Sequence, residues 1–288
     1  MKPPVHKGRG GRAAPRGLDQ FYTRPTVARD CVALLLAVIG EQAGTVFIEP
    51  AAGAGSFLDA LPEPRIGLDI APARADITQA DFLRWWPSLP ATRYVVVSNF
   101  PFGKNASLAV KFVNHAAQFA EVVASILPRT FEKATIQRRV DAGFSLVSET
   151  PLSANSFTYC GEPYAVPVVF QIWRRSAVRR VSVAGPLVHP DFAFLRTPAQ
   201  ADFAFQRVGV QAGLVSVEGL ARAAQSHYFI AVRNRARDVA GILASIDWSS
   251  AKSRTAGNPS IGKAELVAAY QARLAQGGLA SMSGHRGG

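Results

Sequence analysis

The stretch Arg93-Tyr94-Val95-Val96-Val97-Ser98-Asn99-Phe100-Pro101-Phe102-Gly103 decides the fold. It begins as a β-branched, apolar run and ends in Asn-aromatic-Pro-aromatic-Gly. The run predicts a buried parallel strand, which Pro101 and Gly103 terminate. Ligands of open α/β sheets bind at the carboxyl ends of the strands. An amide and two aromatic rings at that position favour a flat, hydrogen-bonding substrate such as a nucleobase.

A strand, a glycine-rich turn and a helix precede this stretch. Thr45–Glu49 is expected to be a short buried strand, followed by Pro50-Ala51-Ala52-Gly53-Ala54-Gly55-Ser56-Phe57 and a short helix through Leu61. The glycines allow close approach of the backbone to a ligand, as in the first unit of a nucleotide-binding domain. Because the GxGxxG pattern is incomplete, an ordinary tight turn explains this segment equally well.

Acidic residues stand at the ends of three successive predicted strands. Glu49 ends the first, Asp69 ends the strand Arg65–Ile70 about twenty residues later, and Asp81 follows another short segment. The spacing of Asp69 is typical of a carboxylate that binds ribose hydroxyls. Taken singly, Asp69 or Asp81 is more often a loop or capping residue. Together with the glycine turn, the three acids indicate a nucleotide-like ligand.

The remaining pattern up to residue 175 alternates helix and strand. We expect a helix from Pro25 to about Ile39, with Thr23 as its N-cap and Gly40 or Gly44 at its end. The later expected elements are a helix at 105–119, a strand at 121–127, a short charged helix at 132–140, and two strands at 144–147 and 166–173 that form a hairpin pair. This predicts an α/β fold with a mostly parallel sheet of seven strands.

The pattern changes after Arg174-Arg175. Short strands are expected near 192–195, 203–210 and 227–232, and helices at 235–246 and 262–274, the second capped by Ser260. We therefore predict a smaller C-terminal α+β module. The predicted organisation is a flexible basic tail (1–17), a catalytic domain (18–176), the small module (177–275) and a second tail (276–288).

Charge and composition limit the choice of partners. The 288 residues carry a formal net charge of +12, although acids dominate between Glu41 and Asp81. The excess positive charge favours a polyanionic partner, nucleic acid before a membrane surface. No apolar run is long enough to span a bilayer, and the two cysteines, Cys31 and Cys160, predict neither a disulfide nor a metal site. We expect a cytoplasmic protein without metal, and the sequence gives no oligomeric state.

Taken in order, these motifs form a recognisable set. Gln20-Phe21-Tyr22-Thr23, the turn from Glu49 to Phe57, Asp69, Asp81 and Asn99-Phe100-Pro101-Phe102 together resemble class I S-adenosylmethionine-dependent methyltransferases that modify N6 of adenine. The small adenine DNA methyltransferases of bacteria and phages are the most similar, over roughly residues 18 to 175. The resemblance implies a Rossmann-like catalytic domain, S-adenosylmethionine as the cofactor and DNA as the partner.

The resemblance also implies roles for individual residues. Tyr22 and Thr23 would contact the methionine end of the cofactor, while Glu49 and the backbone from Ala51 through Gly53 to Gly55 would lie beneath it. Asp69 would bind the ribose, and Asp81 with Phe82 would hold the adenine of the cofactor. The catalytic set would be Asn99, Phe100, Pro101 and Phe102, which receive a target base flipped out of the duplex.

One residue departs from the DNA enzymes, which usually have proline where this chain has Phe100. Asn, an apolar residue, Pro and an aromatic residue is also similar to the ribosomal RNA adenine dimethyltransferases. RNA therefore remains an alternative substrate. A methyltransferase-like nucleic-acid-binding protein without catalysis is a second alternative, and a protein glutamine methyltransferase fits the basic surface less well.

The module after residue 176 is expected to contact the polymer that carries the base. Positively charged side chains near and within this module are the candidates for phosphate contacts. The predicted nucleic-acid-binding residues are Arg129, Arg174, Arg175, Arg233, Arg235 and Lys252.

Overall fold

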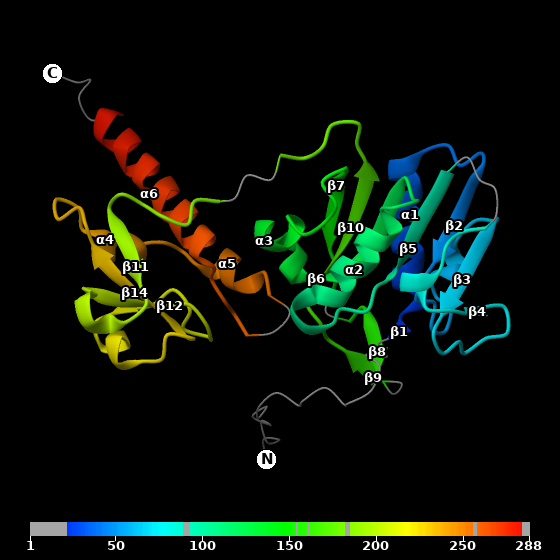
Figure 1. Cartoon of the computed structure of the whole chain (residues 1–288), viewed down its shortest axis with the longest axis horizontal. Coiled ribbons are helices and arrows are strands. Elements are labelled where there is room, and N and C mark those ends of the chain that lie inside the picture. The colour runs from blue at the N-terminus through cyan, green and yellow to red at the C-terminus, as the bar shows by residue number, and fades with distance from the viewer. Residues whose placement is uncertain are drawn as a thin grey trace, which may run out of the picture.

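A seven-stranded sheet and a separate four-stranded sheet organise the computed structural model of this chain (Figure 1). The structure describes residues 22–88, 93–153, 155–159, 162–181, 185–255 and 258–283. The predicted tail 1–17, Gln20, Phe21 and Cys160 lie outside the described residues. The division into domains at residues 176 and 275 remains a prediction, but the strands of the two sheets fall on either side of residue 176.

Fourteen strands form three sheets among the described residues. The seven-stranded sheet has the order β4-β3-β2-β5-β6-β10-β7, a small sheet has the order β1-β8-β9, and the C-terminal sheet has the order β11-β14-β12-β13. The bounds are β1 Tyr22–Thr23, β2 Thr45–Glu49, β3 Arg65–Asp69, β4 Thr78–Gln79, β5 Arg93–Asn99, β6 Val122–Pro128, β7 Phe144–Pro151, β8 Phe157–Tyr159, β9 Glu162–Tyr164, β10 Val168–Arg175, β11 Phe192–Leu195, β12 Phe203–Gln206, β13 Val215–Ser216 and β14 His227–Val232.

Helices connect these strands. The α-helices are α1 Pro25–Ile39, α2 Ser107–Ala116, α3 Ala134–Gln137, α4 Val239–Ala244, α5 Ser249–Ser253 and α6 Lys263–Ser283, and 3₁₀ turns occupy Leu58–Ala60, Phe82–Arg84, Lys104–Ala106, Arg129–Glu132, Pro198–Gln200 and Glu218–Ala221. None of the described helices is both long and apolar enough to cross a membrane.

The large sheet is mostly parallel, as predicted. Strands β2, β3, β4, β5 and β6 pair in parallel, whereas β10 runs antiparallel to both β6 and β7. The predicted hairpin pair is therefore β7 and β10. The strand order reverses between β2 and β5, because β3 and β4 lie beyond β2 while β6 lies beyond β5. Such a reversal opens a crevice at the carboxyl ends of the two strands, where ligands of doubly wound sheets bind.

Both faces of this sheet are covered, which explains why β5 is apolar on both sides. Val95 and Val97 pack with Leu35 of α1 in one buried cluster, whereas Val96 packs with Val113 of α2 in the other. Continuous apolar strands are typical of a parallel sheet between two layers of helices.

The N-cap of α1 is one residue later in the sequence than predicted. Thr23 is not the N-cap, because it belongs to β1 and pairs with Phe157 of β8. The N-cap is Arg24, whose side chain makes no capping hydrogen bond, and Pro25 occupies the first helical position as predicted. The predicted end is confirmed, since Gly40 has φ 70° and its N–H donates to the Leu36 carbonyl.

Other predicted helices are shorter than the pattern suggested. The helix expected at 105–119 begins only at Ser107, because Asn105 and Ala106 have φ 53° and 58°. The helix expected at 132–140 divides into a 3₁₀ turn and α3, and the one expected through Leu61 is a single 3₁₀ turn. Periodicity alone does not reveal a positive φ or a tightened turn.

The C-terminal module has its own apolar core. Strands β11 and β14 match their predicted bounds, and β12 ends at Gln206, earlier than predicted. Phe192, Phe205, Trp248 and Tyr270 lie in a cluster whose buried members all come from this module. The small β1-β8-β9 sheet and β13 were not predicted.

The two C-terminal helices also differ from their predicted bounds. The helix α4 starts at Val239 because the Asp238 carboxylate accepts the Gly241 N–H. The helix α6 starts at Lys263 and extends to Ser283. Ser260 is not its cap, since the Glu265 carboxylate accepts the Gly262 N–H at 2.8 Å.

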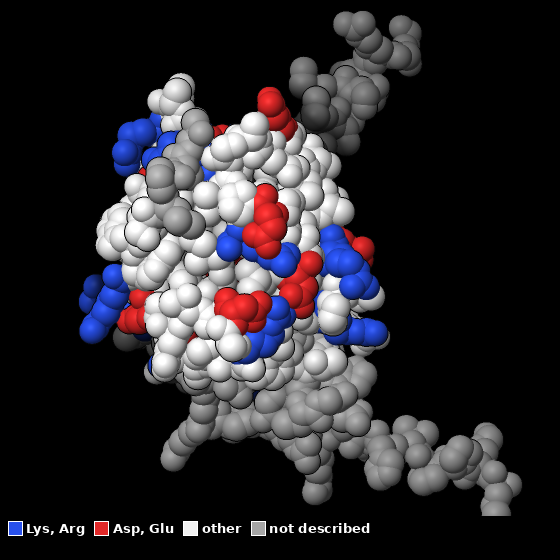
Figure 2. Space-filling view, turned by 90° about the vertical axis from the view of Figure 1, so that its right-hand side faces the viewer, with Lys and Arg blue, Asp and Glu red and all other residues white. Residues whose placement is uncertain are grey.

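Basic and acidic side chains alternate on the face of the molecule at the β4 end of the large sheet (Figure 2). An exposed group of three charges illustrates this, because Arg74 bridges Asp59 and Asp76 with N–O distances of 2.8 and 2.6 Å. The sequence-level excess of acids between Glu41 and Asp81 is therefore partly neutralised within its own region.

Candidate active site

A cavity of about 350 Å³ lies at the crevice between β2 and β5. Its size falls at the lower end of the range for small-molecule sites. It is lined by Tyr22, Thr23, Glu49, Pro50, Ala51, Ala52, Gly53, Ala54, Ser56, Phe57, Asp69, Ile70, Ala71, Asp81, Phe82, Leu83, Asn99, Phe100, Pro101, Phe102, Leu108 and Phe112. The cavity therefore brings together all the predicted catalytic and cofactor-binding residues except Gly55.

Glu49 is a buried acidic residue that lines the cavity. It ends β2, is 2% exposed, and one carboxylate oxygen accepts the Leu58 N–H at 2.6 Å. This bond ties the strand end to the first residue of the following 3₁₀ turn. Burial raises the pKa of Glu49 well above its usual value, against the opposing effect of the backbone N–H groups of Leu58 and Phe57.

Asp69 ends β3 and fixes the glycine turn. One carboxylate oxygen accepts the Gly53 N–H at 2.7 Å, and the other accepts the Ala71 N–H at 2.8 Å. Each carboxylate oxygen has further lone pairs, so the group can also accept hydroxyl hydrogens from a ligand.

Gly53 itself has φ 51°, and a Cβ at this position would stand 3.3 Å from the Tyr22 ring. The turn therefore requires glycine both for its conformation and for the ring of Tyr22 to approach it.

Gly55 supports the turn without lining the cavity. It has φ 84°, and a Cβ here would lie 2.3 Å from an Arg74 guanidinium nitrogen. The Arg74 side chain also donates to the Ala54 carbonyl. The second glycine of the motif therefore accommodates a charged side chain that packs on the outer side of the turn.

Asp81 and Phe82 follow β4. The Asp81 carboxylate accepts the Leu83 N–H at 3.0 Å and so caps the short 3₁₀ turn. Phe82 is 1% exposed, and its ring meets the buried His115 ring edge to face at 4.9 Å between centroids. Asp81 thus has the capping role considered from sequence, and it also lines the cavity.

Asn99 lines the cavity from the end of β5. It is the last residue of β5 and pairs in register with Ile126 of β6. The next peptide is held by Ser125, whose Oγ accepts the Phe100 N–H at 3.3 Å and donates to the Ser98 carbonyl at 2.9 Å. The backbone that follows Asn99 is therefore fixed by a buried hydroxyl of the neighbouring strand.

The two aromatic rings of the motif have different environments. Phe100 is 1% exposed and lies 5.5 Å from Phe112 between ring centroids. Phe102 is half-buried, and its carbonyl accepts the N–H groups of Leu108 and Ala109, at 3.2 and 3.3 Å. Phe100 thus anchors the motif in the core, while Phe102 joins it to the start of α2.

A short strand brings Tyr22 and Thr23 to the cavity. Pairing with β8 holds β1 in place, and Ser56 donates its hydroxyl hydrogen to the Thr23 carbonyl at 2.8 Å. Tyr22 is 39% exposed and Thr23 is buried. A direct hydrogen bond therefore joins this upstream motif to the glycine turn.

Among the residues that sequence reasoning did not identify, one lines the cavity and another supports it from β6. Ile70 follows Asp69 and is 50% exposed although it is large and apolar, so it offers a hydrophobic surface at the cavity. Ser125 interrupts the otherwise apolar strand β6, and that interruption was the available signal. Each residue stands beside a residue that had been identified.

Three of the residues predicted to contact nucleic acid lie near the large sheet, and their side chains bind other groups of the protein. Arg129 forms an ion pair with Glu132 at 2.8 Å. Arg174 donates to the Val38 carbonyl, and Arg175 donates to the Ala117 and Ala120 carbonyls while stacking on Phe144. Arg174 pairs with Val122 at the amino end of β6, so it and Arg175 lie at the edge of the sheet opposite the cavity.

The other three predicted contacts lie in the C-terminal module. Arg233 and Arg235 are exposed, and Arg235 forms an ion pair with Asp202 at 2.8 Å. Lys252 is half-buried, and its ammonium lies 3.4 Å from the Val210 carbonyl. Neither Arg233 nor Lys252 has an ion pair to any residue that the structure describes.

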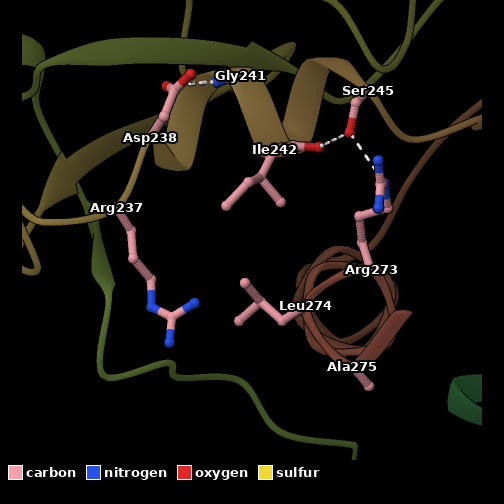
Figure 3. A pocket seen from close by; sticks show the side chains of 8 residues that line it. All are labelled: Arg237, Asp238, Gly241, Ile242, Ser245, Arg273, Leu274 and Ala275. Atoms are coloured by element: carbon pink, nitrogen blue, oxygen red, sulfur yellow. Dashed lines mark hydrogen bonds between the residues drawn. The ribbon is translucent and has the colours of Figure 1, made fainter. Parts of the chain in front are cut away.

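A second cavity lies between α4 and α6. Ile242 and Leu274 point into it, and Arg237 and Arg273 flank it (Figure 3). Arg273 donates to the Ser245 hydroxyl at 3.2 Å, and Arg237 lies 3.3 Å from the Asp191 carboxylate. Asp238 also lines this cavity, so its charges are mixed.

No protein-family model and no curated protein matches the chain. Solved structures show similarity over about half of it. A putative RNA methyltransferase from Pyrococcus horikoshii shares 16% identity, with 55% of this chain and 88% of that chain covered and a TM-score of 0.44. A modification subunit of a putative type I restriction enzyme from Vibrio vulnificus shares 17% identity, with coverage of 55% and 45% and a TM-score of 0.40.

Another similar structure contains bound S-adenosylmethionine. Magnesium protoporphyrin IX methyltransferase from Synechocystis with bound S-adenosylmethionine shares 14% identity with this chain. The similarity covers 53% of this chain and 80% of that chain, with a TM-score of 0.39.

Proposed function

We propose that the chain is an S-adenosylmethionine-dependent methyltransferase. The observation that supports this most directly is the single cavity that contains both the strand-end acids and the Asn99–Phe102 motif. The acidic and glycine residues on one side of the cavity can bind a nucleoside. The amide and aromatic side chains on the other side can bind a planar base. The two sides share one space at the switch point of the sheet, where cofactor and substrate must meet for group transfer.

More particularly, we propose that it methylates N6 of adenine in a nucleic acid, with DNA as the preferred polymer. The residues present fit the cofactor. Asp69 offers two carboxylate oxygens to ribose hydroxyls, the half-exposed Ile70 offers apolar surface to its base beside the buried Phe82, and Tyr22 and Thr23 would contact its methionine end. When bound, S-adenosylmethionine supplies an electrophilic methyl group.

Asn99 positions the amine instead of acting as a strong base. The lone pair of an adenine amino group is delocalised into the ring, so the nitrogen is a poor nucleophile. The side-chain oxygen of Asn99 and the carbonyl oxygen of Phe100 accept its two hydrogens and draw the nitrogen towards tetrahedral geometry. The same acceptors stabilise the positive charge that develops on nitrogen. Holding well-oriented partners in line lowers the barrier by up to about 7–11 kcal/mol.

Phe102 and Pro101 shape the base pocket. Phe102 stacks on the base, which is worth about 1–3 kcal/mol in comparable contacts. Pro101 restricts the backbone of the loop. A base within a duplex cannot reach this cavity, so the target nucleotide is flipped out.

The departure at Phe100 bears less on the polymer than the sequence suggests. Its side chain is 1% exposed and packs against Phe112, so it is the backbone of this residue that faces the substrate. Proline at this position would remove the N–H that donates to Ser125, but it would leave the carbonyl acceptor in place. RNA consequently remains the alternative substrate, to be separated from DNA by direct comparison.

The test is methyl transfer from labelled S-adenosylmethionine to DNA and RNA of matched sequence. We expect label in adenine-containing DNA, and a loss of at least about 100-fold in rate for Asn99→Ala, because one acceptor of the developing charge is removed. Cofactor affinity, measured by calorimetry, should remain within about twofold of the wild type. Equal rates for wild type and Asn99→Ala would contradict the proposed role.

A further inference from the structure

The turn that follows the base-binding motif has an unusual backbone. Gly103 has φ 66°. Asn105 and Ala106, which follow after Lys104, have φ 53° and 58°. Asparagine tolerates this left-handed region, but alanine rarely adopts it, and two successive non-glycine residues there are uncommon. Such conformations persist where the surrounding structure enforces them, and they concentrate at functional sites.

Hydrogen bonds on both sides hold this turn. Arg139 donates to the Asn105 carbonyl at 3.2 Å, and the Ala106 N–H donates to the Gly103 carbonyl at 3.3 Å. Arg139 is itself held, because the Asn114 side-chain amide donates to its carbonyl at 2.8 Å. The turn is thus fixed between the start of α2 and the segment after α3.

Two positive charges are associated with this turn, which directly follows Phe102 of the cavity: Lys104 belongs to it, and Arg139 contacts it from the segment after α3. Lys104 is exposed, and among the described residues it has no ion pair. The exposed Arg139 contacts the next residue of the turn. No Asp or Glu occurs between Asp81 and Glu121, so the strand, motif and turn contain no acidic residue. The positive charge of Lys104 is therefore not neutralised by an acidic residue of the same stretch of sequence.

The position of Lys104 suits the backbone of a flipped nucleotide. It stands two residues after Phe102, so its Cα lies within about 7.6 Å of the Cα of that residue. A base that stacks on Phe102 leaves its sugar and phosphates at the rim of the cavity. Lysine supplies a point charge to phosphate on a long flexible stem, and arginine supplies paired donors.

We propose that the turn Gly103–Ala106 is a phosphate-binding rim, in which Lys104 and Arg139 hold the backbone phosphates of the target nucleotide. This rests on the proposed function, since it requires a polymer whose base enters the cavity. The enforced conformation of Asn105 and Ala106 fixes the rim relative to Asn99. The rim therefore adds affinity for the polymer directly beside the proposed base pocket.

The test uses thymine oligonucleotides with a single adenine, as DNA and as the corresponding uracil RNA. Binding of Lys104→Ala, Arg139→Ala and wild type is measured as a function of salt, without turnover. Loss of one phosphate contact should weaken binding about tenfold and reduce the slope of log K against log salt by about 1. Lys104→Arg, which keeps the charge, should restore most of the affinity.

Arg29→Ala is the matched control. Arg29 is exposed on α1, which covers the opposite face of the sheet, so this variant removes the same charge away from the cavity. Cofactor affinity and thermal unfolding should be unchanged in both Lys104→Ala and Arg29→Ala. Where transfer is measurable, KM for the polymer should rise in Lys104→Ala with little change in kcat.

A neutral linkage locates the contact. Replacing the phosphate next to the adenine by a methylphosphonate should weaken binding to wild type but not further weaken binding to Lys104→Ala. Equal losses in both proteins, identical salt slopes for Lys104→Ala and Arg29→Ala, or no oligonucleotide binding by wild type would overturn the proposal. Binding with an intact rim effect but without N6 methylation would refute the proposed reaction and leave the rim standing.

Discussion

The cavity and the C-terminal module use charged residues in different ways. At the cavity, Asp69 and Glu49 are strand-end acids that accept backbone N–H groups of the adjacent turns. In the module, Arg235 and Arg237 are paired with the acids Asp202 and Asp191. The strand-end acids organise a concave site, whereas these ion pairs reduce the positive charge that the module offers to a polyanion.

This difference shows which sequence signals carry over to the structure. A residue type at the end of a strand predicts a location, because the carboxyl ends of parallel strands meet at one edge. The number of arginines in a sequence predicts only the total charge and not where that charge lies. Arg174 and Arg175 illustrate this, since both bind carbonyl groups at the edge of the sheet away from the cavity.

The largest difference between the two regions should appear on removing Asp69. In Asp69→Ala the Gly53 and Ala71 N–H groups lose their acceptor, and the ligand loses its ribose acceptor. Hydrogen bonds to charged groups contribute about 1.5–3 kcal/mol each. We therefore expect S-adenosylmethionine affinity to fall about 100-fold in calorimetry. The exposed Asp76, which pairs only with Arg74 in the described structure, supplies the control Asp76→Asn, which should bind normally. Equal S-adenosylmethionine affinities for Asp69→Ala and Asp76→Asn would contradict the role assigned to Asp69.

Glu49 offers a second test, through the pH dependence of stability. Its folded pKa is raised by burial, so between the unfolded value, about 4.3, and the folded value the folded state binds more protons than the unfolded state. The contribution of Glu49 to stability therefore falls as pH rises through that window. Each unit of pKa difference corresponds to about 1.4 kcal/mol.

Glu49→Gln cannot ionise and keeps an acceptor for the Leu58 N–H. We expect its unfolding temperature to fall less than that of wild type between pH 4 and pH 8. Thermal unfolding followed by circular dichroism across this range measures the difference. A variant that loses more stability than wild type as pH rises would show that Glu49 is held as a carboxylate.

The smallest effect is expected at the contact between the C-terminal module and the part of the chain that forms the large sheet. Lys133, which follows β6, donates to the Ser260 carbonyl at 2.9 Å and to the Glu265 carboxylate at 3.1 Å. Its side chain is 10% exposed and that of Glu265 is 20% exposed. Lys133→Met should lower the free energy of unfolding by about 1–2 kcal/mol in denaturant titration.

The double variant Lys133→Met/Glu265→Gln tests whether the two residues act as a pair. If they do, it should lose less than the sum of the single losses. Additive losses would mean that the contact does not couple the module to the large sheet.

The sequence predicted the large sheet and most of the cavity for a physical reason. Strands buried on both faces and terminated by Pro or Gly leave a strong local signal, and β2, β5 and β6 appear close to their expected bounds. Glu49, Asp69 and Asn99 could be placed because each ends a strand, and Asp81 because it closely follows one.

Tertiary contacts determined what the sequence did not reveal. Thr23 looked like a cap but pairs with β8, over 130 positions along the chain. The start of α2 moved because Asn105 and Ala106 adopt positive φ, which residue type does not announce. Ser125 acts through a neighbouring strand, and the partners of Arg235 and Arg237 come from distant segments.

The chemical identity of the methylated product tests the central claim most directly. Wild type is incubated with methyl-labelled S-adenosylmethionine and a mixture of DNA and RNA, and the nucleosides are then separated and identified by mass. The account predicts N6-methyladenine, in the deoxynucleoside fraction if DNA is the substrate and in the ribonucleoside fraction if RNA is. Label on cytosine, or on protein alone, would contradict it.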